Sequence, residues 1–197
     1  MNKQDVISFF DCLAPGWDAD MIRHEDVIAT ILDNADIREE LDVLDVACGT
    51  GVLFPDYLSR KVKSLTAIDI APEMVRIARE KFPAVEVLCG DVTEVEIGKK
   101  FDRIVVYNAF PHFPEPEKLI ARLAALLNEG GMLTVAHGMS RAQIDRHHEG
   151  GASKVSVGLM HEDALAELFS KYLTVTVKIS DERMYQVCGQ KSESDCV

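Results

Sequence analysis

The feature that most constrains the fold is an apolar run that carries one acid and ends in a Gly-x-Gly turn, from Val43 to Gly51. Such a run is typical of a strand buried on both faces of a parallel sheet. Because Gly49 and Gly51 lack side chains, their backbone N–H groups can approach a ligand closely. A helix expected to begin near Val52 adds the free N–H groups and the dipole of its N-terminus. The pattern predicts a nucleotide-binding turn at the carboxyl end of a first strand.

A second apolar run, residues 64–70, ends in an acid, Asp69, which lies 18 residues after Gly51. This spacing places a carboxylate where it can accept hydrogen bonds from the ribose hydroxyls of a nucleoside at the glycine turn. Alternatively, Asp69 caps the helix that Pro72 opens. Dinucleotide sites use the same acid, so Asp69 predicts a nucleoside without choosing the cofactor.

The identity of the nucleotide depends on the residues around the turn. The dinucleotide fingerprint requires a third glycine where Phe54 stands. The residues D-V-A-C-G-T-G, which run from Asp45 to Gly51, instead resemble motif I of the class I S-adenosylmethionine (SAM)-dependent methyltransferases. Later motifs follow in the order of that family. The resemblance implies a SAM cofactor, and an NAD-dependent oxidoreductase is the first alternative.

Three later segments carry the same resemblance: D-I-A-P-E-M from Asp69, Gly-Asp-Val at residues 90–92, and a motif-IV-like F-D-x-I from Phe101. The resemblance implies that Asp91 accepts a hydrogen bond from the adenine amino group, although Asp91 could simply cap the next turn. The cofactor-binding residues that the resemblance implies are Trp17, Asp45, Ala47, Gly49, Gly51, Asp69, Ile70, Met74, Asp91, Val92, Asn108 and Ala109.

The N-terminal segment forms a predicted helical cap, residues 1–36, that is broken at Pro15-Gly16. Within it, Phe10 to Asp18 resembles the F-D-x-x-A-x-x-Y/W-D entry segment of the ubiquinone/menaquinone-type methyltransferases. That resemblance implies that the segment folds over the cofactor and that Trp17 lies near its methionine part. The alternative is that Trp17 anchors the N-terminal helix in the core.

Apolar runs that alternate with helical patterns predict an α/β fold. We expect a Rossmann-like, seven-stranded, mostly parallel sheet with helices on both faces. We also expect a helix over 115–128 that Gly130-Gly131 ends. Two runs joined by a short polar link within residues 173–189 predict an antiparallel C-terminal hairpin. The chain is interpreted as a single domain over residues 1–190, followed by a loose tail, 191–197.

Residues 138–158 are long for a plain connection, so they are predicted to contain a short helix and to form a lid over the substrate. The alternative is a solvated loop. A metal site built from His137, His147, His148 and Glu149 is disfavoured, because adjacent histidines on a helix point roughly 100° apart and chelate poorly. No metal site is predicted.

Three histidines are candidates for the catalytic base: His112, His148 and His137. Imidazole titrates near neutrality and can accept a proton from an acceptor molecule. His112 ranks first, because it follows the fourth predicted strand, where the resemblance implies the transferred methyl group. The alternative is that these histidines only shape the pocket or face solvent.

The charge balance bears on the partners of the protein. With 33 acids against 21 bases, the net charge of −12 disfavours nucleic acid and anionic membranes. No apolar run approaches the roughly 20 residues of a membrane span, and the N-terminus lacks a signal-peptide pattern. Five scattered cysteines are typical of free thiols in a reducing cytoplasm. The sequence therefore predicts a cytoplasmic, SAM-dependent methyltransferase that acts on a small molecule, and a non-catalytic SAM-binding sensor or assembly protein is the second alternative. Neither the acceptor nor the oligomeric state follows from the residues.

Overall fold

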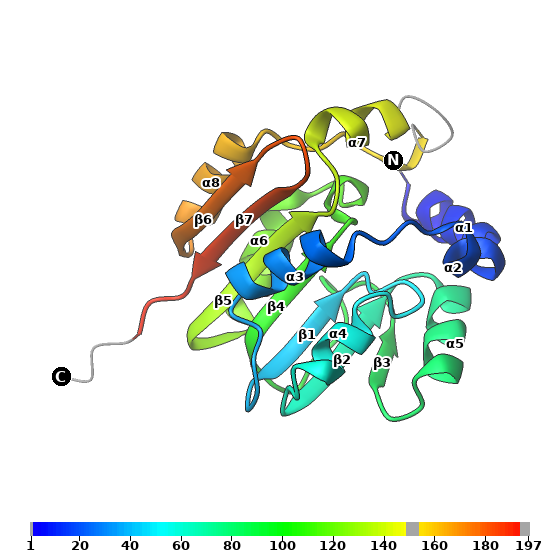
Figure 1. Ribbon diagram of the computed structural model, residues 1–197, viewed down its shortest axis with the longest axis horizontal. Helices are drawn as coiled ribbons and strands as arrows, with labels where there is room; N and C mark the ends of the chain where they lie inside the picture. Colours follow the sequence, from blue (N-terminus) through cyan, green and yellow to red (C-terminus); the bar gives the residue numbers. More distant parts are fainter. Residues whose placement is uncertain (1, 149–153, 194–197) are drawn as a thin grey trace.

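One seven-stranded sheet organises the chain in the computed structural model, which describes residues 2–148 and 154–193 (Figure 1). Its strands are β1 (Asp42–Val46), β2 (Ser64–Asp69), β3 (Glu86–Cys89), β4 (Phe101–Tyr107), β5 (Leu127–His137), β6 (Thr174–Ser180) and β7 (Tyr185–Gln190). The strand order is β3-β2-β1-β4-β5-β7-β6. Strands β1 to β5 pair in parallel, whereas β7 is antiparallel to both β5 and β6. This arrangement confirms the predicted sheet and its C-terminal hairpin.

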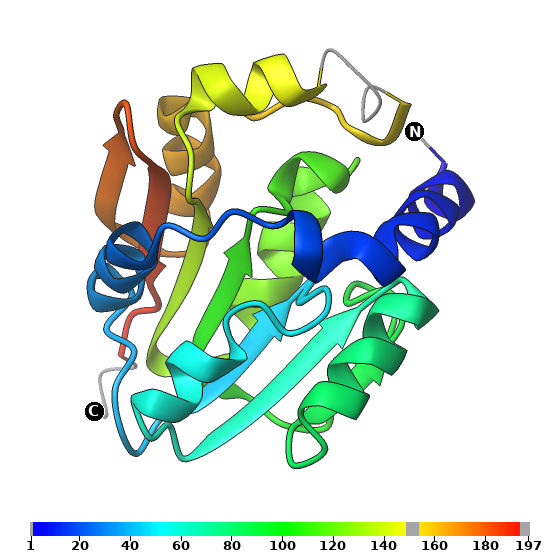
Figure 2. The ribbon, with the colours of Figure 1, turned by 45° about the vertical axis from the view of Figure 1, so that its right-hand side comes forward.

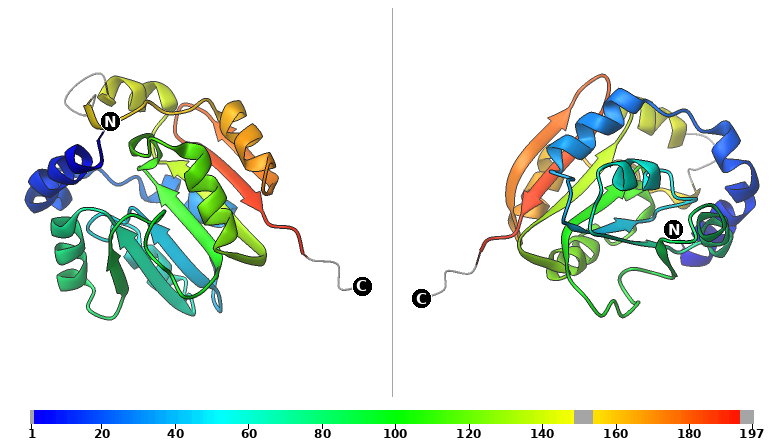
Figure 3. Two further views of the ribbon diagram at one scale, coloured as in Figure 1. Left: turned by 180° about the vertical axis from the view of Figure 1, so that it is seen from behind. Right: turned by 60° about the horizontal axis from the view of Figure 1, so that its bottom comes forward.

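Helices cover both faces of the sheet. They are α1 (Lys3–Leu13), α2 (Trp17–Asp20), α3 (Glu25–Asn34), α4 (Phe54–Ser59), α5 (Pro72–Lys81), α6 (Pro116–Ala125), α7 (Arg141–His148) and α8 (Glu162–Ser170), with short 3-10 turns η1 (Ala14–Gly16) and η2 (Phe110–His112). Figure 3 (left) shows α6 and α8 together on one face, while α3 and α4 lie on the other face, toward the viewer in Figure 1.

The pleat of the strands explains why both faces are buried. In β1, Leu44 and Val46 pack into the cluster that contains the apolar side chains of α6 and α8. Val43, which points the opposite way, packs into the cluster that contains Phe54 and Tyr57 of α4. Successive side chains of a strand face opposite sides of a sheet, so an uninterrupted apolar run supplies both cores at once.

Two sequence-based boundaries need correction. The helix after the glycine turn begins at Phe54 rather than near Val52, because residues 49–53 form turns. The expectation that Gly130-Gly131 ends a helix was wrong: α6 ends at Ala125, and both glycines lie within β5. The β4–β5 register shifts between Phe101 and Arg103, and Gly130, with φ of +71°, takes a backbone conformation that this irregular stretch requires.

The N-terminal cap is a series of short helices. As predicted, the first helix stops at Pro15-Gly16, which form the 3-10 turn η1, and α2 follows at once. Helix α7 falls inside the predicted lid, 138–158, of which residues 149–153 lie outside the described part of the chain. Residues 194–197 of the predicted tail also lie outside it. Figure 2 shows α7 above the carboxyl ends of the central strands, on the side of the molecule where α1 and α2 lie.

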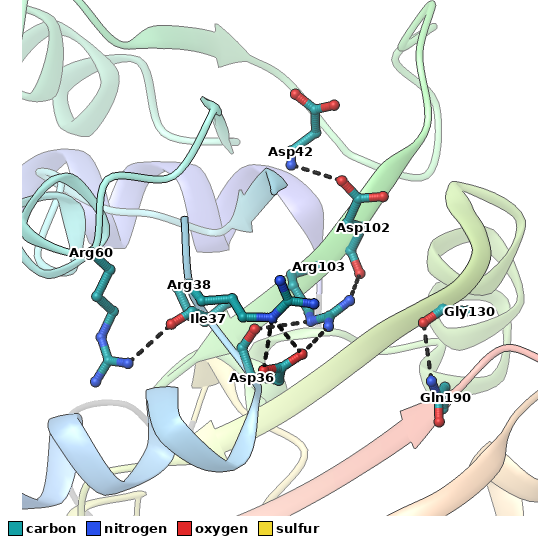
Figure 4. Close-up of polar contacts among 9 residues, drawn as sticks. All are labelled: Asp36, Ile37, Arg38, Asp42, Arg60, Asp102, Arg103, Gly130 and Gln190. Carbon is teal, nitrogen blue, oxygen red and sulfur yellow. Dashed lines mark hydrogen bonds and ion pairs between the residues drawn. The ribbon is translucent and has the colours of Figure 1, made fainter. Parts of the chain in front are cut away.

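A cluster of charged groups holds the opposite end of the sheet, where the parallel strands begin (Figure 4). The Arg103 side chain, only 8% exposed, pairs with the carboxylate of Asp36 and donates to the carbonyl of Asp102 at 2.7 Å. The Asp102 carboxylate in turn accepts from the Asp42 backbone N–H at 2.9 Å. These contacts join the start of β4 to the start of β1 and to the segment after α3. They lie far from the carboxyl ends of the strands, where a ligand site is expected.

Candidate functional site

A cavity of about 360 Å³ opens at the carboxyl ends of the parallel strands. Here the chain order of the sheet reverses, because β1 lies between β2 and β4. Ligands of doubly wound sheets bind at this switch point. The cavity is lined by all but one of the cofactor-binding residues that the resemblance implies: Trp17, Asp45, Ala47, Gly49, Asp69, Ile70, Met74, Asp91, Val92, Asn108 and Ala109. These residues come from five separate segments, so the fold gathers them into one site.

The glycine turn is held against the end of β2. Gly49, with φ of +56°, donates its backbone N–H to the Asp69 carboxylate at 2.8 Å. A Cβ atom at Gly49 would lie 3.7 Å from Nε1 of Trp17, so the turn and the indole enclose the same space. Ala47 and Asn108 also have left-handed backbones, with φ of 55° and 54°. Strained backbone of this kind concentrates at functional sites.

Gly51 is the one implied cofactor residue that does not line the cavity. Its φ is +87°, and a Cβ atom there would lie 2.7 Å from the Phe54 ring and 3.1 Å from the Phe82 ring. The two rings contact each other edge to face, with centroids 5.2 Å apart. Gly51 therefore makes room for the packing of Phe54, the residue that stands at the third-glycine position. Its predicted approach to a ligand stays a prediction, and the structure adds a packing reason for glycine at this position.

Two acids lie buried at the centre of the site. The Asp69 side chain accepts from the backbone N–H groups of Gly49 and of Ala71, the latter at 2.9 Å. The second contact reaches Ala71, the N-cap residue of α5, so it orders the turn before this helix, whereas the helix itself has no side-chain cap. Burial raises the pKa of Asp69, although these hydrogen bonds oppose the shift. Burial, together with the nearby Asp69 charge, also raises the pKa of Asp45, which is 2% exposed. Two buried carboxyl groups therefore lie in one site, and a cation bound beside them would favour their ionised forms.

Asp91 is held from two sides. Its carboxylate accepts from the Thr93 backbone N–H at 2.8 Å, which is the predicted turn cap, and it pairs with the Lys3 ammonium at 2.7 Å. Burial alone would raise the pKa of Asp91, but the Lys3 and Thr93 contacts outweigh it and hold the pKa below its usual value. Lys3 was not predicted as a site residue, because no local pattern links residues this far apart in the chain.

The N-terminal cap is attached to the cofactor loops by its own acids. Asp11 accepts from the Glu73 backbone N–H at 2.8 Å, at the start of α5. Asp18 accepts from the Thr50 hydroxyl at 2.5 Å, inside the glycine turn. Trp17, half-buried between these two acids, lines the cavity. The F-D and W-D pairs of the entry segment thus supply the contacts that hold this segment over the cavity.

Trp17 is the only tryptophan, so its fluorescence reports on this segment alone. If bound cofactor contacts the indole, we expect saturating SAM to change the emission of Trp17 and to slow proteolysis between residues 9 and 20. The Asp18→Asn variant, which weakens attachment to Thr50 and Lys81, should be cleaved faster without ligand. Unchanged emission and unchanged cleavage on adding SAM would show that Trp17 is only a core anchor.

The three candidate bases have different surroundings. His112 lines the cavity. His137 does not line it: its ring is 2% exposed and packs edge to face on Tyr185, with centroids 6.0 Å apart. The hypothesis that His137 acts on a substrate in this cavity is therefore not carried further. His148 ends α7, but its side chain, like that of His147, and the whole of Glu149 lie outside the described part of the chain.

Tyr107 and Gly138 form a contact that the sequence did not reveal. Tyr107, at the end of β4, lines the cavity, and burial raises its pKa to about 12. A Cβ atom at Gly138 would collide with the Tyr107 hydroxyl oxygen, so a larger residue there would require the Tyr107 side chain to move. Gly138 also donates its backbone N–H to the Asn108 side chain at 2.9 Å. These contacts fix the connection after β5 against the left-handed residue after β4.

Two further searches concern the described residues only. Within residues 2–148 and 154–193, no group of three or more His, Cys, Asp or Glu side chains is placed to hold a metal ion. Over the same residues, none of the helices combines the length and the apolar character that a membrane crossing needs.

Comparison with known proteins agrees with this geometry. Residues 43–131 match the model of a methyltransferase domain family. A malonyl-[acyl-carrier protein] O-methyltransferase of Acetivibrio thermocellus is 33% identical over 138 residues, which cover 68% of this chain and 49% of that protein. The ubiquinone/menaquinone biosynthesis C-methyltransferase UbiE of Campylobacter jejuni is 24% identical over 152 residues, 68% of this chain and 64% of that protein. The chain thus spans about half to two thirds of the length of these two relatives.

A solved structure extends the likeness to almost the whole chain. The N-methyltransferase NodS of Bradyrhizobium japonicum, in complex with S-adenosyl-L-homocysteine, superimposes with a TM-score of 0.73 at 15% identity, over 98% of this chain and 100% of that one. At 15% sequence identity, this similarity shows a shared fold. The sheet order and the motif residues at its switch point define a Rossmann-like methyltransferase fold. Together with the matched domain and the named relatives, they support a class I SAM-dependent methyltransferase.

Proposed function

We propose that this protein binds SAM in the cavity at the switch point and transfers its methyl group to a small-molecule acceptor. The observation that carries the proposal is that eleven of the twelve cofactor-binding residues implied by the resemblance line one cavity. Its volume of about 360 Å³ falls within the range of small-molecule sites. A carboxylate for a ribose, Asp69, and a carboxylate for an adenine amino group, Asp91, lie in the same cavity.

The charges of the site suit this cofactor. SAM carries a sulfonium and an ammonium cation, and the cavity wall holds the buried acids Asp45 and Asp69. Burying a carboxylate is costly unless an opposite charge compensates it. A cationic ligand beside Asp45 therefore offsets a cost that the unliganded fold carries. The neutral glycine turn lets the chain approach that ligand closely at Gly49.

The main contribution of the protein residues is to hold the cofactor and the acceptor in position. When bound, SAM supplies an electrophilic methyl group, and methyl transfer requires the attacking atom to lie in line with the methyl–sulfur bond. Holding reactants in such a geometry accounts for much of the rate of a reaction of this kind. Trp17, Asn108 and Ala109 line the part of the cavity that the family resemblance assigns to the methionine moiety. The cap over residues 1–36 and the lid over 138–158 are proposed to exclude water from it.

A small-molecule acceptor is favoured by two features. The net charge of −12 opposes the approach of nucleic acid. The two relatives named above are one enzyme of ubiquinone/menaquinone biosynthesis and one named for a malonyl-[acyl-carrier protein]. A non-catalytic SAM-binding role would use the same cofactor residues, so only turnover separates it from an enzyme. An NAD-dependent role is disfavoured, because Phe54 fills the space that the third glycine of a dinucleotide site leaves open.

Calorimetric titration tests the cofactor directly. We expect SAM and its demethylated product to bind with micromolar or tighter dissociation constants, and NAD to show no heat of binding at the same concentrations. Methyl-labelled SAM incubated with the protein and a cell extract, followed by mass spectrometry, should then reveal a labelled small molecule. NAD binding without SAM binding would contradict the proposed function, whereas SAM binding without any labelled product would favour the non-catalytic role.

A further inference from the structure

We propose that His112 is the catalytic residue that takes a proton from the methyl acceptor, and that its Nε2 atom does so because the backbone of a second segment fixes its tautomer. This inference rests on the proposed function. It also names the acceptor class: a group, such as a hydroxyl, whose attacking atom still carries a proton at neutral pH. Acceptors that are already ionised would need no such residue.

The tautomer follows from one hydrogen bond. His112 Nδ1 lies 2.6 Å from the carbonyl oxygen of Val155. A carbonyl oxygen can only accept, so Nδ1 must carry the proton that is donated. In a neutral imidazole the other nitrogen, Nε2, then has the basic lone pair. The backbone N–H of Val157 donates to the carbonyl of Pro111 at 2.9 Å, so the segment that holds Nδ1 is itself tied to the turn η2.

The position of the ring is set from the opposite side by the N-terminal cap. The Phe10 ring meets the imidazole edge to face, with centroids 4.9 Å apart, and meets Trp17 in the same way at 5.8 Å. Trp17 in turn lies over Gly49 of the cofactor turn. His112 is thus half-buried between three segments that are distant in sequence, and it lines the same cavity as the cofactor residues.

The surroundings favour a neutral acceptor group over an ionised one. Apolar side chains make up much of the cavity wall outside the implied cofactor residues: Val6, Phe10, Met21, Phe113, Pro114 and Leu119. An apolar wall penalises an acceptor that enters as an anion. Charged or titratable groups also line the cavity from α1, β4, the loop after β3 and the segment that begins α6, namely Lys3, Tyr107, Asp91, Glu94, Glu115 and Lys118. Because these groups can also titrate, the pH dependence of the wild-type rate must be compared with that of His112 variants.

The proposed step balances as follows. The O–H bond of the acceptor would break, and its proton would form an N–H bond at Nε2 of His112. The electron pair left on oxygen would form the new bond to the methyl carbon as the bond from that carbon to the sulfonium sulfur breaks, with its electron pair left on the sulfur of the departing demethylated cofactor. The imidazole becomes an imidazolium whose Nδ1–H still donates to the Val155 carbonyl, so the charge is stabilised where it forms. A positioned base of this kind contributes roughly 10²- to 10⁴-fold to a rate.

The first test concerns the protein alone and needs no turnover. Two-bond ¹H–¹⁵N correlation spectra of histidine-labelled protein distinguish protonated from unprotonated ring nitrogens. At a pH where His112 is neutral, we expect Nδ1 to be protonated and Nε2 to be unprotonated. The His112→Asn variant, whose missing signals assign the resonance, keeps an N–H near the position of Nδ1. It should therefore fold and bind SAM like the wild type. A neutral imidazole that carries its proton on Nε2 would overturn the proposal.

The second test compares two acceptor probes of the same shape, phenol and thiophenol, at pH 8. Phenol keeps its proton there, whereas thiophenol is largely ionised. We expect His112→Asn to slow the methylation of phenol by about 10²-fold or more, with thiophenol methylation close to wild type. The phenol rate of the variant should rise with pH as phenolate forms. An equal loss with both probes would show that His112 only shapes the site.

The failures of the two proposals are distinguishable. If SAM does not bind, the proposed function fails and the inference fails with it. If SAM binds and thiophenol is methylated but phenol is not, the assigned acceptor class is wrong while the methyltransferase function stands. If phenol is methylated and His112→Asn is as fast as the wild type across pH 5 to 9, no proton passes to His112.

Discussion

Replacing Asp69 with alanine is expected to weaken SAM binding by about 1.5–3 kcal/mol, roughly 10- to 100-fold. The variant removes the proposed acceptor for the ribose hydroxyls. It also leaves the backbone N–H groups of Gly49 and Ala71 without the carboxylate that now accepts from them at 2.8 and 2.9 Å. The cofactor turn therefore loses both a ligand contact and its attachment to β2. Calorimetry with SAM measures the change, and unchanged affinity would show that Asp69 only holds the glycine turn and the turn before α5.

Asp45→Asn is a companion variant, because it removes the neighbouring buried carboxylate. The pKa of Asp45 is raised in the folded protein by burial and by the Asp69 charge. A carboxyl group whose folded pKa lies above its unfolded value destabilises the fold once the pH exceeds the unfolded pKa of about 4, and the cost grows up to the folded pKa. Below the unfolded pKa the cost is absent. Asp45→Asn should thus raise the free energy of unfolding at pH 7.5 but not at pH 4, as measured by urea denaturation.

The same variant separates stability from binding. If the negative charge of Asp45 serves a cationic ligand, Asp45→Asn should be more stable than the wild type without ligand and yet bind SAM more weakly. Such a trade-off is common where an active site carries a cost for its function. A variant that gains stability at pH 7.5 and binds SAM as tightly as the wild type would contradict a ligand role for Asp45.

The second large effect is expected from Gly51→Ala, which should lower the free energy of unfolding by about 2–5 kcal/mol. A left-handed backbone with a Cβ atom costs about 1–2 kcal/mol, and forcing an atom into a packed core costs about 1–3 kcal/mol. Both apply, because φ is +87° and the added atom would lie 2.7 Å from the buried Phe54 ring.

Gly98→Ala provides the control for Gly51→Ala. A Cβ atom at Gly98 meets no atom within 4 Å, and this glycine is exposed. We therefore expect Gly98→Ala to leave the midpoint of urea denaturation unchanged or slightly raised, since alanine restricts the unfolded chain. Equal midpoints for the two variants would show that the Phe54 and Phe82 rings move aside and that the turn accepts a side chain.

The sheet and the cofactor half of the site could be predicted from the sequence because both depend on local pattern. Apolar runs such as Val43 to Val46 define buried strands, and the residue that ends each run lies at the same edge of the sheet as its neighbours. Asp69 was found by this rule and Asp91 by the family resemblance, and both line the cavity. At Gly51 the sequence did not reveal that the Phe54 ring packs where a side chain would lie, because a glycine motif does not say which atom occupies that space.

Only the tertiary structure decided which distant residues meet in the cavity. Lys3 pairs with Asp91, Asp18 accepts from Thr50, and the Val155 carbonyl accepts from His112. No residue spacing in the sequence predicts any of these three contacts. Each depends on how a cap or a connection packs after the sheet has formed. The sequence determined the strands, their order of motifs and the cofactor class, since hydrophobic period and turn chemistry are properties of neighbouring residues. The residues on the acceptor side of the cavity are brought together by packing between segments, since side-chain contacts across a fold depend on three-dimensional distance alone.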